Sequence, residues 1–149
     1  MKLAEGLLLR ADLMKKIEHL VNRIRPVLIV ADDKQPQEDP VKLLAQLRKA
    51  NQDLESIVVK INRTNNETFI GDGVTVMEAL AKRDALKLLS EKLRNIRQGA
   101  QINNSGSYGK QIATVDIKAL QIEIDQTGRA FREIDSKVQE INWLTELKE

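Results

Sequence analysis

The chain has 149 residues, of which 42% are hydrophobic and only 3% aromatic, and its formal net charge is +2. This length predicts one domain with a core of its own, and the shortage of aromatic residues favours aliphatic side chains packed between helices. Cysteine is absent, so disulfides and thiolate sites are excluded.

The first predicted helix runs from Lys2 to Arg25 and ends there because Pro26 disfavours a helical residue before it. Its apolar residues recur at steps of three and four, which is the spacing of one helix face. They are Leu13, Ile17, Leu20 and Ile24. The β-branched run from Val27 to Val30 predicts a short strand after the helix.

Asp39 and Pro40 predict the start of a second helix, because aspartate caps free backbone N–H groups and proline suits the first helical position. The helix is expected to run to about Asn62. Its stripe again alternates steps of four and three, at Leu43, Leu47, Ala50, Leu54, Ile57 and Ile61.

Gly71-Asp72-Gly73 predicts a tight turn, which would form a small hairpin between the flanking apolar residues. Thr75 and Glu78 then have the spacing of a capping box and predict the start of a third helix, with Gly99 as its end. The apolar residues expected along this helix are Leu80, Leu86, Leu89, Leu93 and Ile96.

The last predicted helix, from Thr114 to Leu147, carries the strongest pattern in the chain. Its seam comprises Ile117, Leu120, Ile124, Thr127, Phe131, Ile134, Val138 and Ile141. This helix would exceed the other three by roughly ten residues, or about 15 Å. An apolar seam that continues past its cover predicts a second subunit.

The predicted fold is therefore all-α, a four-helix antiparallel bundle with coiled-coil character, a long last helix and small strand pieces in the loops. We expect residues 1–149 to form a single helical domain. Because short connections make neighbouring helices antiparallel, the first and third loops would lie at one end. Val27–Val30 and Gln111–Val115 are then predicted to pair as strands.

The sequence offers little chemistry. His19 is the only histidine, no nucleophile motif accompanies it, and a zinc site would need several more ligands. The glycine-containing segment from Gly106 to Lys110 lacks the spacing of a phosphate-binding loop, so it predicts a loop with Tyr108 as a contact residue. We expect no catalytic residue, no metal and no cofactor.

Two polar clusters remain as candidates. Asn62-Arg63-Thr64-Asn65 follows the second stripe, where helix capping and turn hydrogen bonds are the ordinary explanation. The second cluster, Asn142 to Glu146, holds Trp143, the only tryptophan. It either staples the last helical turn to the core or anchors an interface, as isolated tryptophans often do.

The chain resembles a bacterial family of small helical proteins of unknown function called septicolysin-like. The matching segments are Met1–Glu5 with Arg10–Leu13, Ile61–Asn65, Glu78–Asp84, Thr114–Asp116 and Asn142–Leu147. The resemblance implies a helical, coiled-coil-like protein without an established activity, and its name suggests a cytolysin. Gly6 and Gly128 depart from the expected pattern and would loosen local packing.

We therefore expect a non-enzymatic cytoplasmic protein that forms a homo-oligomer or binds a protein partner, with Phe131, Asn142 and Trp143 at the interface. One alternative is a membrane-active, pore-forming protein using amphipathic helices, although no spanning segment is present. A further alternative is a small-ligand or nucleic-acid binder using Asn62, Arg63, Asn65 and Tyr108. Acids interrupt every basic run, so nucleic acid is not the expected partner.

Overall fold

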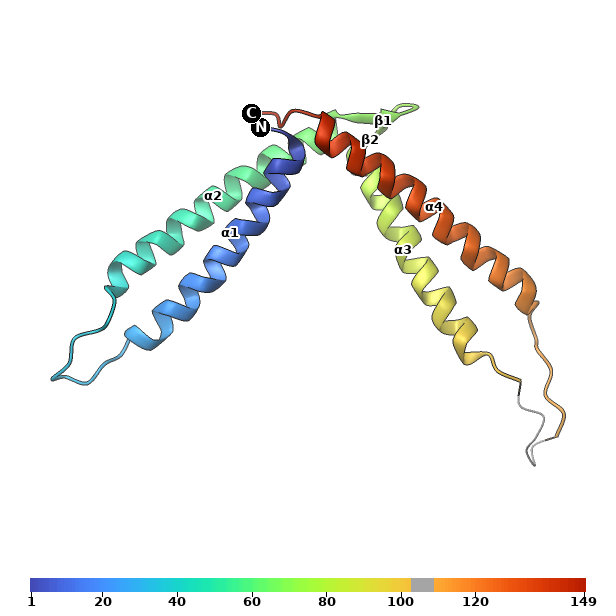
Figure 1. Ribbon diagram of the computed structural model, residues 1–149, viewed down its shortest axis with the longest axis horizontal. Coiled ribbons are helices and arrows are strands. Elements are labelled where there is room, and N and C mark those ends of the chain that lie inside the picture. Colours follow the sequence, from blue (N-terminus) through green and yellow to red (C-terminus); the bar gives the residue numbers. More distant parts are fainter. Residues whose placement is uncertain (103–108) are drawn as a thin grey trace. The chain divides into compact units, whose positions relative to one another are not determined.

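The computed structural model describes residues 1–102 and 109–149. It contains four helices and one small hairpin (Figure 1). The elements are α1 (Leu3–Ile24), a 3-10 turn η1 (Arg25–Val27), α2 (Pro40–Glu67), β1 (Phe69–Gly71), β2 (Val74–Thr75), α3 (Val76–Gly99) and α4 (Ile117–Leu144). The predicted all-α class, the antiparallel packing of helix pairs and the small hairpin are confirmed.

The chain divides into two compact units, and each contains one antiparallel helix pair. The first unit comprises Met1–Thr68 and Asn142–Glu149 and is built on α1 and α2. The second comprises Phe69–Ile141 and holds the hairpin, α3 and nearly all of α4.

The α1/α2 pair buries the two apolar stripes that the sequence predicted. At one end of the pair a cluster forms from Leu20, Ile24, Val27, Leu43 and Ala50, with Ile17, Leu44 and Leu47 packed against it. At the other end Leu3, Leu13, Ile57 and Ile61 cluster with Leu7, Leu54 and Leu147. Each fully buried aliphatic side chain stabilises the fold by about 1.5–3 kcal/mol, so this seam provides the core of the first unit.

The start of α2 follows the predicted capping chemistry. The Asp39 carboxylate accepts hydrogen bonds from the N–H groups of Val41 (2.9 Å) and Lys42 (3.3 Å), and Pro40 occupies the first helical position. Thr75 and Glu78 form the predicted capping box at the start of α3. At the hairpin, Asp72 and Gly73 both have positive φ, which is the backbone that a two-residue turn requires.

The strand pairing predicted between Val27–Val30 and Gln111–Val115 is wrong. Among the described residues only β1 and β2 pair as strands. Val27 instead completes the 3-10 turn, and the following Leu28 keeps helical backbone angles. A β-branched run becomes a strand only where a second strand supplies its hydrogen bonds, and none lies beside it here.

Two helix boundaries differ from the prediction. The helix α2 continues past Asn62 to Glu67, so the cluster Asn62–Asn65 is helical. The helix α4 begins at Ile117 and not at Thr114, and Asp116 caps it by accepting from the N–H of Ala119 (3.0 Å). It ends at Leu144, so it has 28 residues, as α2 does.

The seam of α4 is covered by its own chain. Ile124, Thr127 and Val138 are buried, and the other five seam residues are half-buried. The prediction that the last helix is roughly ten residues longer than the other three is therefore wrong, because α4 and α2 have the same length. The argument for a second subunit that depended on this extra length does not hold. Any case for assembly needs another surface.

The buried face of α3 agrees only in part with the apolar stripe that the sequence predicted. Val76, Ala79 and Ser90 are its buried residues, while Leu89 and Ile96 are exposed. Arg83, Ser90 and Arg97 stand seven residues apart along the inner side, so every second layer of this seam is polar. Of the five predicted apolar residues, Leu80, Leu86 and Leu93 are half-buried, and Leu89 and Ile96 lie on the exposed side.

Removing the cap of α2 gives a direct check of this architecture. Asp39→Ala should lower the free energy of unfolding by about 1 kcal/mol, because two backbone N–H groups lose their acceptor. Urea denaturation followed by circular dichroism measures the loss. Asp33→Ala, in the same exposed loop, is the control and should change stability by less than about 0.5 kcal/mol; equal losses would contradict the capping role.

Candidate functional site

The most elaborate site in the first unit lies where its two chain ends meet. We call the segment Thr145–Glu149 the tail. The N–H of Leu3 donates to the carbonyl of Thr145 (2.9 Å), and the N–H of Leu147 donates to the carbonyl of Met1 (2.8 Å). Lys2 and Glu146 thereby form an antiparallel bridge, and the tail is held alongside the first residues of the chain.

Thr64 attaches the tail to α2. Its side chain is fully buried at 0% exposure. The Thr64 hydroxyl donates to the carbonyl of Lys60 (2.8 Å) and accepts from the N–H of Lys148 (2.9 Å). Because the hydroxyl both donates and accepts, these hydrogen bonds offset the cost of burying it, and the last turns of α2 gain a tertiary partner. This contact explains why the helix extends past Asn62.

Ion pairs line both sides of the tail. Lys148 pairs with Glu67 (2.7 Å), Lys2 pairs with Glu146 (2.7 Å), and Lys60 pairs with Glu149. The hydrogen bond from Lys148 lowers the pKa of Glu67, and its positive charge adds to the effect. Hydrogen bonds from Lys2 and from Lys60 lower the pKa of Glu146 and of Glu149 in the same way.

Leu147 is the apolar anchor of the tail, and Gly6 makes room for it. A Cβ atom on Gly6 would lie 3.2 Å from Cδ2 of Leu147 and 3.6 Å from Cδ1 of Ile57. Such a contact is tighter than ordinary van der Waals packing. Gly6 therefore does not loosen the packing as expected; the missing side chain lets Leu147 reach the core cluster.

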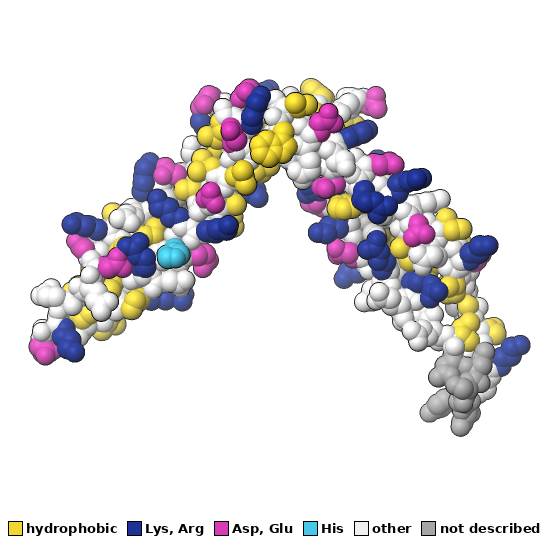
Figure 2. All heavy atoms as spheres, viewed as in Figure 1, with side chains coloured by type: hydrophobic (Ala, Val, Ile, Leu, Met, Phe, Trp, Pro, Cys, Tyr) yellow, Lys and Arg dark blue, Asp and Glu magenta, His cyan; other side chains and the backbone are white. Residues whose placement is uncertain are grey.

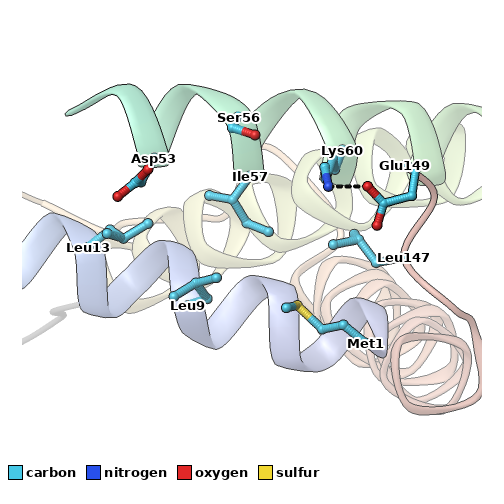
Figure 3. A pocket seen from close by; sticks show the side chains of 9 residues that line it. All are labelled: Met1, Leu9, Leu13, Asp53, Ser56, Ile57, Lys60, Leu147 and Glu149. Atoms are coloured by element: carbon cyan, nitrogen blue, oxygen red, sulfur yellow. Dashed lines mark hydrogen bonds and ion pairs between the residues drawn. The ribbon is translucent and has the colours of Figure 1, made fainter. Parts of the chain in front are cut away.

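A pocket of about 330 Å³ opens beside this anchor between α1 and α2 (Figure 3). Met1, Leu9, Leu13, Ile57 and Leu147 form its apolar part, and Asp53, Ser56, Lys60 and Glu149 form its polar part. In Figure 3 Lys60 and Glu149 point towards each other at one end, while Leu9 and Leu13 lie on the α1 side. Its chemistry suits a short aliphatic group with one polar end.

The first predicted polar cluster lies partly in this site. Arg63 donates a hydrogen bond to the main-chain oxygen of Glu149, so it holds the tail. Asn62 is exposed on α2 and Asn65 is half-buried. A ligand that used Arg63 would have to replace the tail as its partner.

The remaining predicted residues are dispersed. Asn142 is buried at 8% exposure, while Trp143 is 58% exposed and does not staple the last turn into a core. Phe131 is half-buried on α4 in the second unit. Tyr108 lies outside the described residues. Thr64, Gly6 and Leu147 are the residues whose roles here sequence reasoning missed, and a glycine inside an apolar helix was the available signal.

Across residues 1–102 and 109–149, no three carboxylate or imidazole side chains gather closely enough to hold a metal ion. None of the helices in the described part of the chain is both long and apolar enough to cross a membrane.

Truncating the anchor tests the importance of the tail for stability. Leu147→Ala should lower the free energy of unfolding by about 1–2 kcal/mol, because it leaves a void in the cluster that Leu3 and Ile57 share. Leu144→Ala is the matched control, since Leu144 is 64% exposed, and should cost less than about 0.5 kcal/mol. Gly6→Leu, which displaces Leu147, should reproduce the loss; normal stability in both variants would show that the anchor is dispensable.

Acid should release the tail. A glutamate whose pKa is lowered by folding contributes stability that is present above its ordinary value of about 4.5 and is lost as the pH falls through the folded value. We therefore expect the amide of Leu147 to exchange faster as the pH falls below about 4.5, after correction for intrinsic exchange. Glu67→Gln and Glu146→Gln together should remove most of this pH dependence, whereas Glu55→Gln, at an exposed position, should keep it.

Comparisons with known proteins place these features in a family. A crystal structure of a functionally unknown conserved protein from Corynebacterium diphtheriae superposes with a TM-score of 0.88 at 32% sequence identity, covering 99% of each chain. The comparison with curated proteins gave no significant match. The model of a family of unknown function, DUF6847, matches residues 10–147, and neither match carries the septicolysin name. The chain therefore belongs to this family of unknown function, DUF6847.

Proposed function

We propose that this protein is a non-enzymatic helical module that acts by self-association, through the outer face of α3. The observation that carries the proposal is the group of large apolar side chains that this helix leaves exposed. Met77, Leu88, Leu89 and Ile96 are 50%, 56%, 45% and 59% exposed, respectively. A helix in a finished fold ordinarily turns such residues inward, so an outward apolar face indicates a further partner.

The outer face has the pattern of a helix interface. Met77, Ala81, Ala85, Leu88 and Leu89 follow one another at steps of four, four, three and one, and all are exposed. Small side chains at Ala81 and Ala85 would let a second helix approach closely, beside larger ones that can fill the space. This alternation of small and large residues supports packing against another helix.

A second copy of the chain fits this face. Two copies of α3 lying antiparallel about Ala85 would set Ala81 of each against Leu89 of the other. The same arrangement would bring Glu78 near Lys92 of the second copy, which adds charge complementarity. The exposed pair Trp143 and Leu144, 58% and 64% exposed, would supply an additional contact surface in the first unit.

The non-enzymatic part of the proposal draws support from where the perturbed titrating groups lie. The shifted carboxylates Glu67, Glu146 and Glu149 each owe their lowered pKa to a surface partner that holds the tail. Glu38 pairs with Arg23, and Glu78 belongs to a helix cap. These roles are structural. We extend the proposal to a cytoplasmic location, which cell fractionation would test.

The septicolysin-like resemblance supplies a second candidate, a membrane-active protein. The observation that favours it is the same outer face of α3, because Lys82 and Lys92 accompany its apolar residues as in helices that lie on lipid. Dye release from vesicles containing anionic lipid would support this candidate. Retention of the dye at all lipid compositions would rule out the membrane-active candidate and keep self-association as the proposed function.

Charge placed on the outer face should separate the copies. Leu89→Lys with Ile96→Lys should weaken self-association on the order of a hundredfold, because two apolar contacts are lost and two charges would be buried. Analytical ultracentrifugation from about 1 to 100 µM would show the shift towards the monomer.

Ile29→Lys is the matched control, because Ile29 is a loop residue at 89% exposure and its replacement adds the same charge elsewhere. It should leave the assembly unchanged. A wild-type chain that stays monomeric throughout the concentration range would overturn the proposal.

A further inference from the structure

We propose that Ser90, Arg94 and Arg132 form a binding site for a small phosphate-type oxyanion beside Gly128, in the second unit. The geometry around Gly128 suggests it. A Cβ atom placed on this glycine would lie 3.5 Å from Nη2 of Arg94, 3.5 Å from Nη1 of Arg132 and 3.7 Å from Oγ of Ser90. Three hydrogen-bond donors from α3 and α4 thus converge where the main chain carries no side chain.

The positive charges at this point are not neutralised. Within the described ranges, neither Arg94 nor Arg132 has a carboxylate within ion-pair distance. Arg83, on the same helix pair, shows the ordinary alternative, because it pairs with Asp84 (2.8 Å) and Asp135 (3.4 Å). Two guanidinium groups brought together without an acid between them are a typical anion receptor.

The Ser90 hydroxyl is a third donor at this point, and it has no partner among the described residues. Ser90 is only 5% exposed, yet its hydroxyl makes no hydrogen bond with any residue that the structure describes. Thr127, a comparably buried residue of the same unit, instead donates to the carbonyl of Glu123 (2.8 Å). The hydroxyl oxygen keeps some contact with solvent, because the fully buried side-chain atom without a partner in the described part of the chain is Nε of Arg97. An oxyanion held by the two arginines would accept the Ser90 proton in place of water.

Arg94 and Arg132 are both exposed, so a small ion can reach them from solvent. A hollow of about 280 Å³, lined by Asp125, Gln126, Arg129 and Arg132, shares only Arg132 with the proposed site. Asp125 accepts a hydrogen bond from Gln121 (3.1 Å), so its carboxylate is engaged on its own helix. In Figure 2 Lys and Arg side chains lie interspersed with Asp and Glu over α3 and α4 on the face shown. A tetrahedral oxyanion, with oxygens directed to both guanidinium groups and to the hydroxyl, suits this donor set.

The test uses the full chain labelled with nitrogen-15. Inorganic phosphate and pyrophosphate are titrated at constant ionic strength, with chloride as the reference, while the arginine Nε–H resonances are followed. We expect saturable shifts of Arg94 and Arg132. Arg94→Gln and Arg132→Gln should each raise the dissociation constant about tenfold or more, because each removes a charged donor. Arg48→Gln, an exposed arginine of α2, should leave it unchanged.

Gly128→Ala separates binding from folding. Alanine favours the helix, and its Cβ meets the three donors only at ordinary contact distance, so thermal stability should be kept or raised. The added methyl nevertheless occupies the point of convergence, so the affinity for phosphate should fall. Unsaturable shifts up to tens of millimolar phosphate, or equal losses in Arg48→Gln, would overturn the proposal. Binding of duplex DNA without a response to phosphate would also overturn it.

Discussion

Two helices can bury only the strip along which they touch, and most of this structure follows from that limit. Each unit of the chain rests on one antiparallel pair, so each helix has one inner stripe and a broad outer surface. The composition of the inner stripe decides how stable a pair is by itself. What remains on the outer surface decides what the pair can bind.

The two pairs use that strip differently. Between α1 and α2 it is almost wholly aliphatic, from Leu3 to Ile24 on one helix and from Leu43 to Ile61 on the other. Between α3 and α4, polar residues such as Arg83 and Ser90 occupy alternate layers. Polar layers fix the register of a helix pair at some cost in stability. The apolar residues that α3 does not use inward are the basis for proposing association, and the unpaired arginines near Gly128 are the basis for proposing an anion site.

The tail adds to the α1/α2 pair a third segment that packs against its core. Leu147 adds a third element to the core at the end of the pair, and Thr64 ties the tail to α2 without leaving an unsatisfied group. The ion pairs around it are exposed, so they select the position of the tail more than they stabilise it. The pocket of Figure 3 exists because the tail borders one side of the groove between α1 and α2.

The sequence by itself determined the four helices, the caps at Asp39 and Thr75, the hairpin turn at Asp72 and the inner stripes of α1, α2 and α4. These depend on neighbouring residues, and a spacing of three and four is visible in one chain. Only the tertiary structure decided that α3 turns Ser90 inward and Leu89 outward, that Gly6 receives Leu147, and that Val27–Val30 form no strand. Each of those outcomes depends on a partner far away in sequence. Local spacing shows that a helix has an apolar face, whereas the neighbour that packs against it determines which face is buried.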